Sequence, residues 1–566
     1  MKNFIALYLM FVAVSLTAQS KYFEKVIEWH YFTSAYSIVQ KSNNNFVITG
    51  STSLDNTLWA SSYLLEVDNS GVLVAYDTYL TNQYESAAFD ITSCNDGFMM
   101  VGYANVGTNN SNSFFIKVDS SGTFIDSTFV GRAPYTNNPN TICSTRDGGF
   151  LLGGEIQPYA PPNGQPTHPY LIKLDAAGNK LWDTIYYQYG APYYAWVRDI
   201  KLCPTGGYYL LMADKYNYYD GNSVIAKIDE DGVILNQETI DYGLEENTGA
   251  MAVMSNGDII LTGSIVNNAS TPTQRTGLVI RLNSNFGEIW RKTSEFKGVS
   301  ACGNIAQTPD GGYLATGCNI ANGNVGVEVV KYNVGGGVKW VRHYGSATQD
   351  DYIFDMIPTA DGGYISCGRA VRTPAGYFPY LLKVNCMGLL TEPQANFTTQ
   401  IDTAALRITA QNLSQYTYPD SLDGGHYIWD FGDGTPPLQT QNTTDTLLHT
   451  YPQHGTYTVT LKAIVCTDTS TLQQTLTVGY PPPPPTIEGI WLSPNPATDQ
   501  LFINSQEPLQ ANLVLYNALG QKVGNSSLWG NSTQINVANL PSGIYLYQII
   551  NPQNQTLQEG KLSILH

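Results

Sequence analysis

The chain has 566 residues, of which only 13% are charged, and its 28 basic and 46 acidic residues give a net charge of −18. A length of this order predicts several domains rather than one. The excess of acidic residues, without a long run of positive or negative charge, argues against a nucleic-acid partner.

The first residues have the pattern of an export signal. Lys2 precedes an apolar run from Phe4 to Leu16, and small residues follow up to Ala18. This pattern is typical of a secretory signal peptide over residues 1–18. No later run of about 18 apolar residues occurs, so we expect no transmembrane segment in the mature chain.

Eight cysteines follow this segment, in a chain expected to reach an oxidising compartment. Cys302 and Cys318 lie eight residues either side of Asp310, at the centre of an expected hairpin turn. They could therefore face each other and form a disulfide; the alternative is two small buried residues. The cysteines show no CxxC pair, so we expect no metal site.

A turn followed by an apolar strand, as in "TRDGGFLLGG" at residues 145–154, recurs seven times. Each copy has an aromatic or aliphatic residue directly after the turn: Phe46, Phe98, Phe150, Tyr208, Ile259, Tyr313 and Tyr364. These residues are separated by 52, 52, 58, 51, 54 and 51 positions. The period is typical of propeller blades rather than helical solenoids.

Each repeat contains four short strands joined by Gly, Asp and Asn turns, which we expect to be two-residue hairpin loops with positive φ. The last repeat lacks a clear fourth strand, and "KVIEWHYF" at residues 25–32 matches that missing strand. An N-terminal strand that completes the last blade closes the ring and removes the free edges. We therefore predict an all-β chain with a seven-bladed β-propeller over residues 21–391. An open β-solenoid is the alternative.

These repeats resemble those of large secreted bacterial surface proteins. The segment "LDAAGNKLW" is also similar to the strand and turn of quinoprotein-type propellers. The resemblance implies the fold and not a quinone cofactor.

Residues 393–479 carry two further motifs, "WDFGDG" and "HTYPQHGTYTV". The matching positions are Trp429, Asp430, Phe431, Gly432, Asp433, Gly434, His449, Tyr451, Gly455, Tyr457 and Val459. This segment resembles the PKD domain, a small β-sandwich of immunoglobulin-like shape. Around "YTYPDSLDGGH" it departs slightly from the family pattern.

A proline linker over residues 480–486 precedes a last segment, residues 487–566, with four motif blocks. The blocks contain Pro494, Asn495 and Pro496; Tyr516, Asn517, Gly520 and Gln521; Leu540, Gly543 and Tyr545; and Lys561. The segment resembles the type A C-terminal sorting domain of the type IX secretion system. The resemblance implies a second small β-sandwich, a partnership with that secretion machinery, and release or attachment at the cell surface.

Catalytic motifs are lacking in the sequence. Its seven histidines are scattered, and no HExxH motif, nucleophile elbow or phosphate loop occurs. Carboxylates in predicted connectors could converge to form a catalytic pair. The candidates are Glu245, Glu246, Asp350 and Asp351, and the alternative is that they are solvated loop residues. We expect no cofactor. Calcium is the one weak option, at "KIDEDG" (residues 227–232) or at Asp430 and Asp433, where turn capping is the favoured interpretation.

The connectors after the second and fourth strands of each repeat vary in length and composition, which predicts a recognition face. Two connectors are rich in aromatic residues: Tyr186, Tyr187, Tyr189, Tyr193, Tyr194, Trp196, Tyr216, Tyr218 and Tyr219. Tyrosine suits sugar rings or protein partners, although these side chains could instead pack between blades.

The sequence thus predicts a non-catalytic secreted or cell-surface binding protein, with a role in carbohydrate binding or adhesion. Its propeller face would recognise a glycan or a protein, and the PKD domain would act as a spacer. The alternatives are a carbohydrate-active enzyme with loop carboxylates and a purely structural surface protein.

Overall fold

The computed structural model describes residues 20–566, apart from several short segments. These segments are residues 29, 31, 54–59, 81–84, 106–110, 133–134, 158–165, 187–193, 218–219, 243–245, 267–274, 298–302, 322–323, 374–375, 418–424, 442–445 and 480–488. The expected signal peptide lies outside the described residues. All regular elements of the described chain are β-strands, which confirms the predicted fold class.

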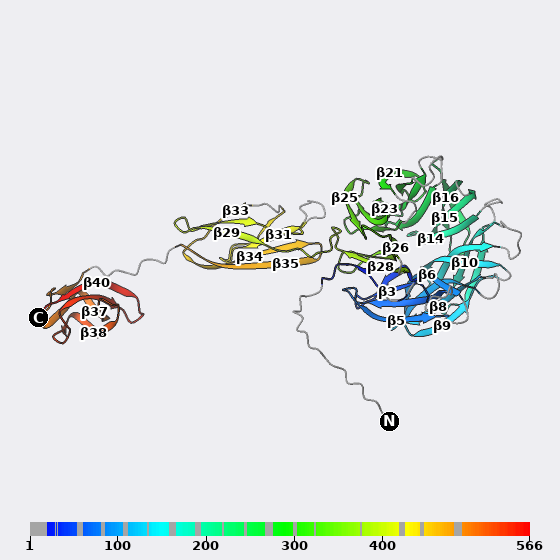
Figure 1. Ribbon diagram of the computed structural model, residues 1–566. Coiled ribbons are helices and arrows are strands. Elements are labelled where there is room, and N and C mark those ends of the chain that lie inside the picture. Colours follow the sequence, from blue (N-terminus) through cyan, green and yellow to red (C-terminus); the bar gives the residue numbers. More distant parts are fainter. Residues whose placement is uncertain are drawn as a thin grey trace, which may run out of the picture.

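Seven four-stranded antiparallel sheets form a ring, in which each sheet is one blade (Figure 1). Blades 1 and 2 consist of β2 (Ser34–Gln40), β3 (Phe46–Ser53), β4 (Ala60–Val67), β5 (Leu73–Tyr79), β6 (Glu85–Cys94), β7 (Gly97–Asn105), β8 (Ser111–Asp119) and β9 (Phe124–Phe129). Blades 3 and 4 consist of β10 (Thr136–Ser144), β11 (Phe150–Gln157), β12 (His168–Leu174), β13 (Lys180–Ile185), β14 (Tyr194–Leu202), β15 (Tyr208–Asn217), β16 (Asp220–Ile228) and β17 (Ile234–Ile240). Blades 5 and 6 consist of β18 (Glu246–Val253), β19 (Ile259–Val266), β20 (Arg275–Leu282), β21 (Glu288–Lys297), β22 (Ile305–Gln307), β23 (Tyr313–Ala321), β24 (Asn324–Tyr332) and β25 (Val338–Tyr344).

Blade 7 is closed by the N-terminus. It contains β26 (Asp351–Pro358), β27 (Tyr364–Arg372) and β28 (Gly376–Val384), and its fourth strand is β1 (Phe23–Val26). Phe23 pairs with Lys383 and Val26 with Tyr380. The expected closure is therefore present, but the strand begins two residues before the predicted segment and ends at Val26. Apolar side chains of blades 1 and 7, among them Ile38, Tyr63 and Leu381, pack together in one core.

In six of the seven blades the repeated turn differs in detail from the expected two-residue loop, which blade 2 has between Cys94 and Gly97. Thr145 N–H donates to Gly149 O at 2.9 Å and Gly148 N–H donates to Thr145 O at 3.0 Å, so three residues separate the closing pair. Only Gly148 has positive φ, at 80°. A turn of this kind needs one left-handed residue rather than two. The buried ammonium of Lys173 then reaches back to Asp147 at 2.8 Å, which ties the turn to the third strand of its blade.

The PKD segment forms two facing sheets around Trp429, which is fully buried. Its strands are β29 (Phe397–Asp402), β30 (Arg407–Asn412), β31 (His426–Asp430), β32 (Leu438–Thr440), β33 (Thr446–Thr450), β34 (Gly455–Val465) and β35 (Asp468–Val478). Alternate residues of β34 face the core, among them Val459 and Leu461. This is the pattern expected of a half-buried strand.

The C-terminal segment is one five-stranded sheet that encloses its own core. Its strands are β36 (Ile490–Ser493), β37 (Gln500–Tyr516), β38 (Lys522–Asn536), β39 (Gly543–Ile550) and β40 (Thr556–Ile564). The long strand β37 pairs with β36 along its first part, with β39 along its last part, and with β38 along both. Buried residues from all five strands meet in this core.

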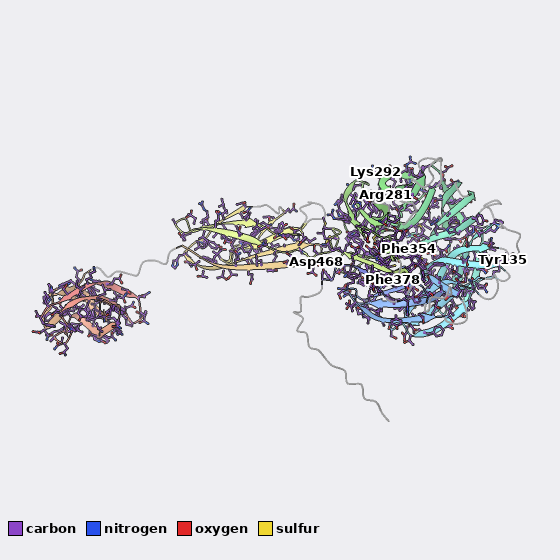
Figure 2. The ribbon with its side chains drawn as sticks, viewed as in Figure 1. Tyr135, Arg281, Lys292, Phe354, Phe378 and Asp468 are labelled. Carbon is purple, nitrogen blue, oxygen red and sulfur yellow. A yellow bond between two sulfur atoms is a disulfide. The ribbon has the colours of Figure 1, made fainter. Side chains whose placement is uncertain are left out.

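The propeller and the PKD domain are joined by a covalent and ionic junction. A disulfide links Cys386, in the turn after β28, to Cys466, in the turn between β34 and β35. Asp468 of the same PKD turn accepts a hydrogen bond of 2.7 Å from the Tyr22 hydroxyl and pairs with Lys21 (Figure 2). The residues directly before the closing strand β1 therefore also hold the PKD domain.

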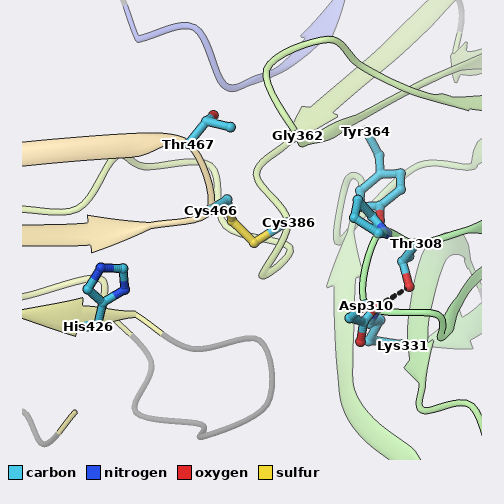
Figure 3. Close-up of a pocket in the computed structure, with 10 residues that line it drawn as sticks. Thr308, Asp310, Lys331, Gly362, Tyr364, Cys386, His426, Cys466 and Thr467 are labelled. Atoms are coloured by element: carbon cyan, nitrogen blue, oxygen red, sulfur yellow. Dashed lines mark hydrogen bonds and ion pairs between the residues drawn. A yellow bond between two sulfur atoms is a disulfide. The ribbon is translucent and has the colours of Figure 1, made fainter.

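A cavity of about 520 Å³ lies beside this disulfide, between blades 6 and 7 and the PKD domain (Figure 3). Thr308, Tyr364 and His426 are among its lining residues. On its propeller side, Lys331 pairs with Asp310.

We predict that replacement of Cys466 by serine in the full chain lowers the free energy of unfolding of the PKD domain by about 2–5 kcal/mol, since the disulfide closes a long loop that contains most of this domain. Urea unfolding followed by tryptophan fluorescence measures this loss. The wild-type protein in the presence of dithiothreitol should match the variant, and dithiothreitol should not change the variant further. Equal urea midpoints for the two oxidised proteins would contradict the junction's role.

Candidate functional site

The innermost strands of six blades share a β-bulge. In each, the register with the second strand shifts around one extra residue: Tyr36, Phe89, Asn140, Arg198, Gly249 and Phe354. A bulge bends the strand and redirects a side chain, and bulges occur preferentially near functional sites. Figure 2 places one of these residues, Phe354, near the middle of the ring.

A glycine on the second strand accommodates each of four bulges. A Cβ atom on Gly368 would lie 1.8 Å from Tyr352 O, and one on Gly102 would lie 1.8 Å from Ala87 O. The equivalent distances for Gly50 and Gly154 are 1.9 and 2.0 Å. No other residue fits such a contact, so the bulge explains the last glycine of "FLLGG" and its equivalents.

After four of the six bulges, the next residue is Ser37, Asp90, Asp199 or Asp355, and its side chain connects neighbouring blades. Asp355 Oδ2 accepts from Ile38 N–H at 3.0 Å, which joins blade 7 to blade 1. Asp90 Oδ2 accepts from Ile142 N–H at 2.8 Å, which joins blade 2 to blade 3. Asn304 of blade 6, which follows no bulge among the described residues, donates to Asp355 Oδ1 and joins blade 6 to blade 7. We call Ser37, Asp90, Asp199, Asn304 and Asp355 the axial belt.

Ser37 connects the two aspartates within this belt. Its hydroxyl lies 2.7 Å from Asp90 Oδ1 and 3.0 Å from Asp355 Oδ2. Burial, followed by the nearby Asp355 carboxylate, raises the pKa of Asp90 to about 6. Burial also raises the pKa of Asp355. The pair therefore titrates as a unit and holds a proton under mildly acidic conditions.

On the opposite side of the belt, the carboxylate of Asp199 has a cationic partner. Asp199 Oδ1 lies 3.0 Å from Lys201 Nζ, and Asp199 Oδ2 accepts from Met251 N–H at 2.9 Å. Burial disfavours the charge on Lys201, but the attraction of Asp199 and Asp90 outweighs burial and raises the pKa of Lys201.

Half-buried aromatic side chains of blades 7, 1 and 2 meet at the inner end of the blades. The ring centre of Tyr36 lies 5.3 Å from that of Phe89 and 5.6 Å from that of Phe354. Tyr103 lies 5.6 Å from Phe89, and the rings of Tyr352 and Phe354 are nearly parallel, with centres 6.4 Å apart. We call these five residues, together with Arg369, the axial site.

The axial site lies toward the variable connectors. Tyr352 and Phe354 fall in the first half of β26, which begins at a connector. Arg369 falls in the second half of β27, which ends at one. The recognition face expected from loop variation is thus on the same side as these side chains.

The predicted tyrosine cluster is only partly described. Tyr187, Tyr189, Tyr193, Tyr218 and Tyr219 lie outside the described residues, as does the side chain of Tyr216. Tyr194 is 44% exposed at the start of β14, and Trp196 is half-buried two residues further on. The guanidinium carbon of Arg198 lies 5.1 Å from the Trp196 ring centre.

Tyr186 has a packing role instead of a place on a binding surface. Its side chain is buried, and its hydroxyl donates to Gly232 O in the next blade at 2.8 Å. Tyr79 and Tyr344 donate in the same way to Gly122 O and Gly388 O, at 2.7 and 2.5 Å. The contact therefore recurs around the ring, as the alternative of blade packing anticipated.

The connector carboxylates that are described also have structural partners. Asp351 is fully buried and pairs with Arg372 at 2.8 Å, and Asp350 accepts from Val325 N–H at 2.7 Å. Glu245 and the side chain of Glu246 lie outside the described residues.

In the acidic turns considered for calcium binding, the carboxylates accept hydrogen bonds from backbone N–H groups of the same turn. Asp229 Oδ1 accepts from Asp231 and Val233 N–H, at 3.0 and 2.8 Å. In the PKD domain, Asp430 and Asp433 accept from the N–H groups of Gly432 and Thr435. Across the described ranges, no group of three or more His, Cys, Asp or Glu side chains could hold a metal ion.

Cys318 is buried, but Cys302 lies outside the described residues, so a disulfide between them stays a prediction. The observed disulfide joins two cysteines that the sequence spacing did not single out.

The sorting motifs cooperate in the fold of the C-terminal domain. Asn495 donates to Lys561 O at 3.1 Å and accepts from Ser563 N–H at 2.8 Å, which joins the first and last motif blocks. Asn517 accepts from Gln521 N–H at 3.0 Å across a turn that contains Gly520. Pro494 and Pro496 flank Asn495, while Tyr545 donates to Pro541 O at 2.8 Å, near Leu540 and Gly543. The hydroxyl of Tyr516 reaches Gln548 at 3.4 Å.

The fold and these motifs define an all-β multidomain protein built for export. Residues 391–479 match the family model of the PKD domain, and residues 492–562 match that of the secretion system C-terminal sorting domain. The chain is therefore a type IX secretion cargo that is secreted or attached to the outer surface. Where the chain is described, no helix is long and apolar enough to cross a membrane.

No curated protein sequence matches the chain. Solved structures similar to it include polysaccharide lyase Uly1, with 11% identity over 66% of this chain and 94% of the other and a TM-score of 0.40. An ulvan lyase bound to -[GlcA(1-4)Rha3S]- has 10% identity, coverages of 65% and 96% and a TM-score of 0.42. Sqt1 from Chaetomium thermophilum has 11% identity, coverages of 64% and 99% and a TM-score of 0.36.

The raised pKa of Asp90 predicts a pH-dependent stability. Its pKa is about 6 in the folded state against an ordinary 3.8, so the folded state binds the proton more tightly. The stabilisation is complete below about pH 4 and is lost as the pH rises through about 6. Asp90→Asn removes the buried charge and should stabilise the protein by about 3 kcal/mol at pH 7.5 and by only about 1 kcal/mol at pH 4.5, since each pKa unit corresponds to about 1.4 kcal/mol.

Urea unfolding at these two pH values measures the effect. The matched control is Asp199→Asn, which should destabilise the protein at pH 7.5 because Lys201 loses its partner. A difference between wild type and Asp90→Asn that is equal at both pH values would contradict this account.

Proposed function

We propose that the protein is a non-catalytic exported binding protein whose ligand occupies the axial site. The observation that carries this proposal is the meeting of Tyr36, Phe89 and Phe354 from three different blades, each at a bulge and each half-buried. Aromatic rings left partly accessible at a bulge offer flat apolar area without loss of a packed core.

The ligand class that fits such a surface is a glycan, since the apolar face of a sugar ring packs on an aromatic ring and a tyrosine hydroxyl can bond its edge. A protein partner is the alternative within the same function. The PKD domain, fixed to the ring by the disulfide and by Asp468, would act as a spacer next to the propeller.

A carbohydrate-active enzyme is the second candidate, and the Asp90 and Asp355 pair favours it. Two carboxyl groups of which one has a raised pKa are the usual apparatus of glycoside hydrolysis. Both groups, however, accept backbone N–H groups of the next blade, which gives them a structural role in the ring. We therefore place binding first.

A panel of glycans and peptides offered to the full chain tests the proposal by isothermal titration calorimetry and by detection of released products. Phe354→Ala should weaken binding about tenfold while no product is released. Phe124→Ala, on the outer strand of blade 2, where the ring is 50% exposed, is the matched control and should bind as wild type.

Product release that Asp90→Asn abolishes would replace the binding proposal with the enzyme. Binding that Phe354→Ala leaves unchanged would place the ligand elsewhere.

A further inference from the structure

Arg369 is a cation enclosed by aromatic rings at the axial site. Its guanidinium carbon lies 4.8 Å from the ring centre of Tyr377, 5.1 Å from that of Tyr352 and 5.8 Å from that of Phe354. The side chain is half-buried. Its position directly follows Gly368, the glycine that accommodates the bulge at Phe354.

No described residue pairs with this guanidinium through a carboxylate or accepts a hydrogen bond from it. Its Nε atom is shielded from solvent and lacks a hydrogen-bond partner in the described part of the chain. Arg372, three positions further along β27, behaves differently, because it pairs with Asp351 at 2.8 Å and donates to Val371 O at 2.9 Å. The lack of a partner is thus a property of Arg369 and not of arginines on this strand.

The aromatic contacts leave the hydrogen-bonding capacity of Arg369 unused. A ring face attracts the positive charge but accepts none of the in-plane N–H groups in the usual way. Those groups form a planar fork that matches a carboxylate or a sulfate. Partial burial lowers the local dielectric constant and strengthens such a pair.

The surroundings favour an anion carried on a ring. Tyr352 and Phe354 are nearly parallel, with 11° between their planes, and both ring centres lie within 6 Å of the guanidinium carbon. The chain as a whole has a net charge of −18, so its general field repels anions and the selection has to be local.

We infer that the axial site recognises an acidic saccharide, a sugar ring with a carboxylate or sulfate group, and that Arg369 binds the anionic group while Tyr352 and Phe354 support the ring. This inference rests on the proposed function and names its ligand class. Arg369 determines the preference for acidic over neutral sugars.

The test compares hexagalacturonate with its carboxyl-reduced counterpart, which has the same chain length and no charge. Calorimetry on the full chain should show binding of the acidic oligosaccharide about tenfold tighter than that of the neutral one, and added salt should reduce the difference. Sulfated carrageenan oligosaccharide and its desulfated form make a second pair, which distinguishes a sulfate from a carboxylate as the source of the anion.

Arg369→Gln should lower the affinity for the acidic oligosaccharide to that for the neutral one, and Arg369→Lys should retain part of the preference. Arg291→Gln is the matched control, since Arg291 also lies over a tyrosine ring, that of Tyr242 at 3.9 Å, but on the outer strand of blade 5. It should bind as wild type. Thermal melting of each variant checks that the ring is intact.

Equal affinity for the charged and neutral members of both pairs would overturn the inference, as would an equal loss of both affinities in Arg369→Gln. If neutral glycans or peptides bind through Phe354 without dependence on Arg369, the inference fails while the proposed function stands. If neither these oligosaccharides nor any member of the wider panel binds, both fail.

Discussion

Closure of the ring by the N-terminal strand is the constraint on which the remaining structure depends. The four residues of β1 pair with β28, so the segment that precedes blade 1 forms the outer strand of blade 7. A four-residue pairing is a small contact for so large a ring. The junction strengthens it, because Lys21 and Tyr22, directly before β1, bind Asp468 of the PKD domain, and the disulfide holds that domain to the same blade. The PKD domain therefore helps to hold the closing end of the propeller.

The bulge in the innermost strands positions the side chains of both the axial site and the axial belt. The same irregularity presents an extra side chain and sends the next residue toward the neighbouring blade. In blades 7, 1 and 2 the extra residues are aromatic and meet one another, while the next residues, Asp355, Ser37 and Asp90, form the belt that connects these blades. The proposed recognition and the cohesion of the ring thus depend on one local feature. A substitution in the belt is expected to act on stability, and one in the axial site on binding.

Much of the architecture could be predicted from the sequence, because turns and strand periodicity are local properties. The repeat of "DGG" before Phe150, Tyr313 and Tyr364 marked the blades, and the motifs around Trp429 and Asn495 marked the two C-terminal domains. The axial site was missed, although a signal exists: an aspartate follows the bulged residue in "FDI", "RDI" and "FDM". Its meaning depends on contacts between blades about 50 residues apart in the chain, which no local pattern reveals.

Contacts between segments that are distant in the chain also explain two other differences between the sequence prediction and the structure. Tyr186 resembles a surface aromatic in sequence, but its hydroxyl reaches a carbonyl in the next blade, 46 positions away. Cys386 and Cys466 are 80 positions apart in different domains, and only the closed ring brings them together.

The most direct test of the central claim is a crystal structure of the full chain with hexagalacturonate. The account predicts a sugar ring against Tyr352 and Phe354, with a carboxylate about 3 Å from the terminal nitrogens of Arg369. An oligosaccharide bound only on the PKD domain or on the outer strands of the blades would contradict it.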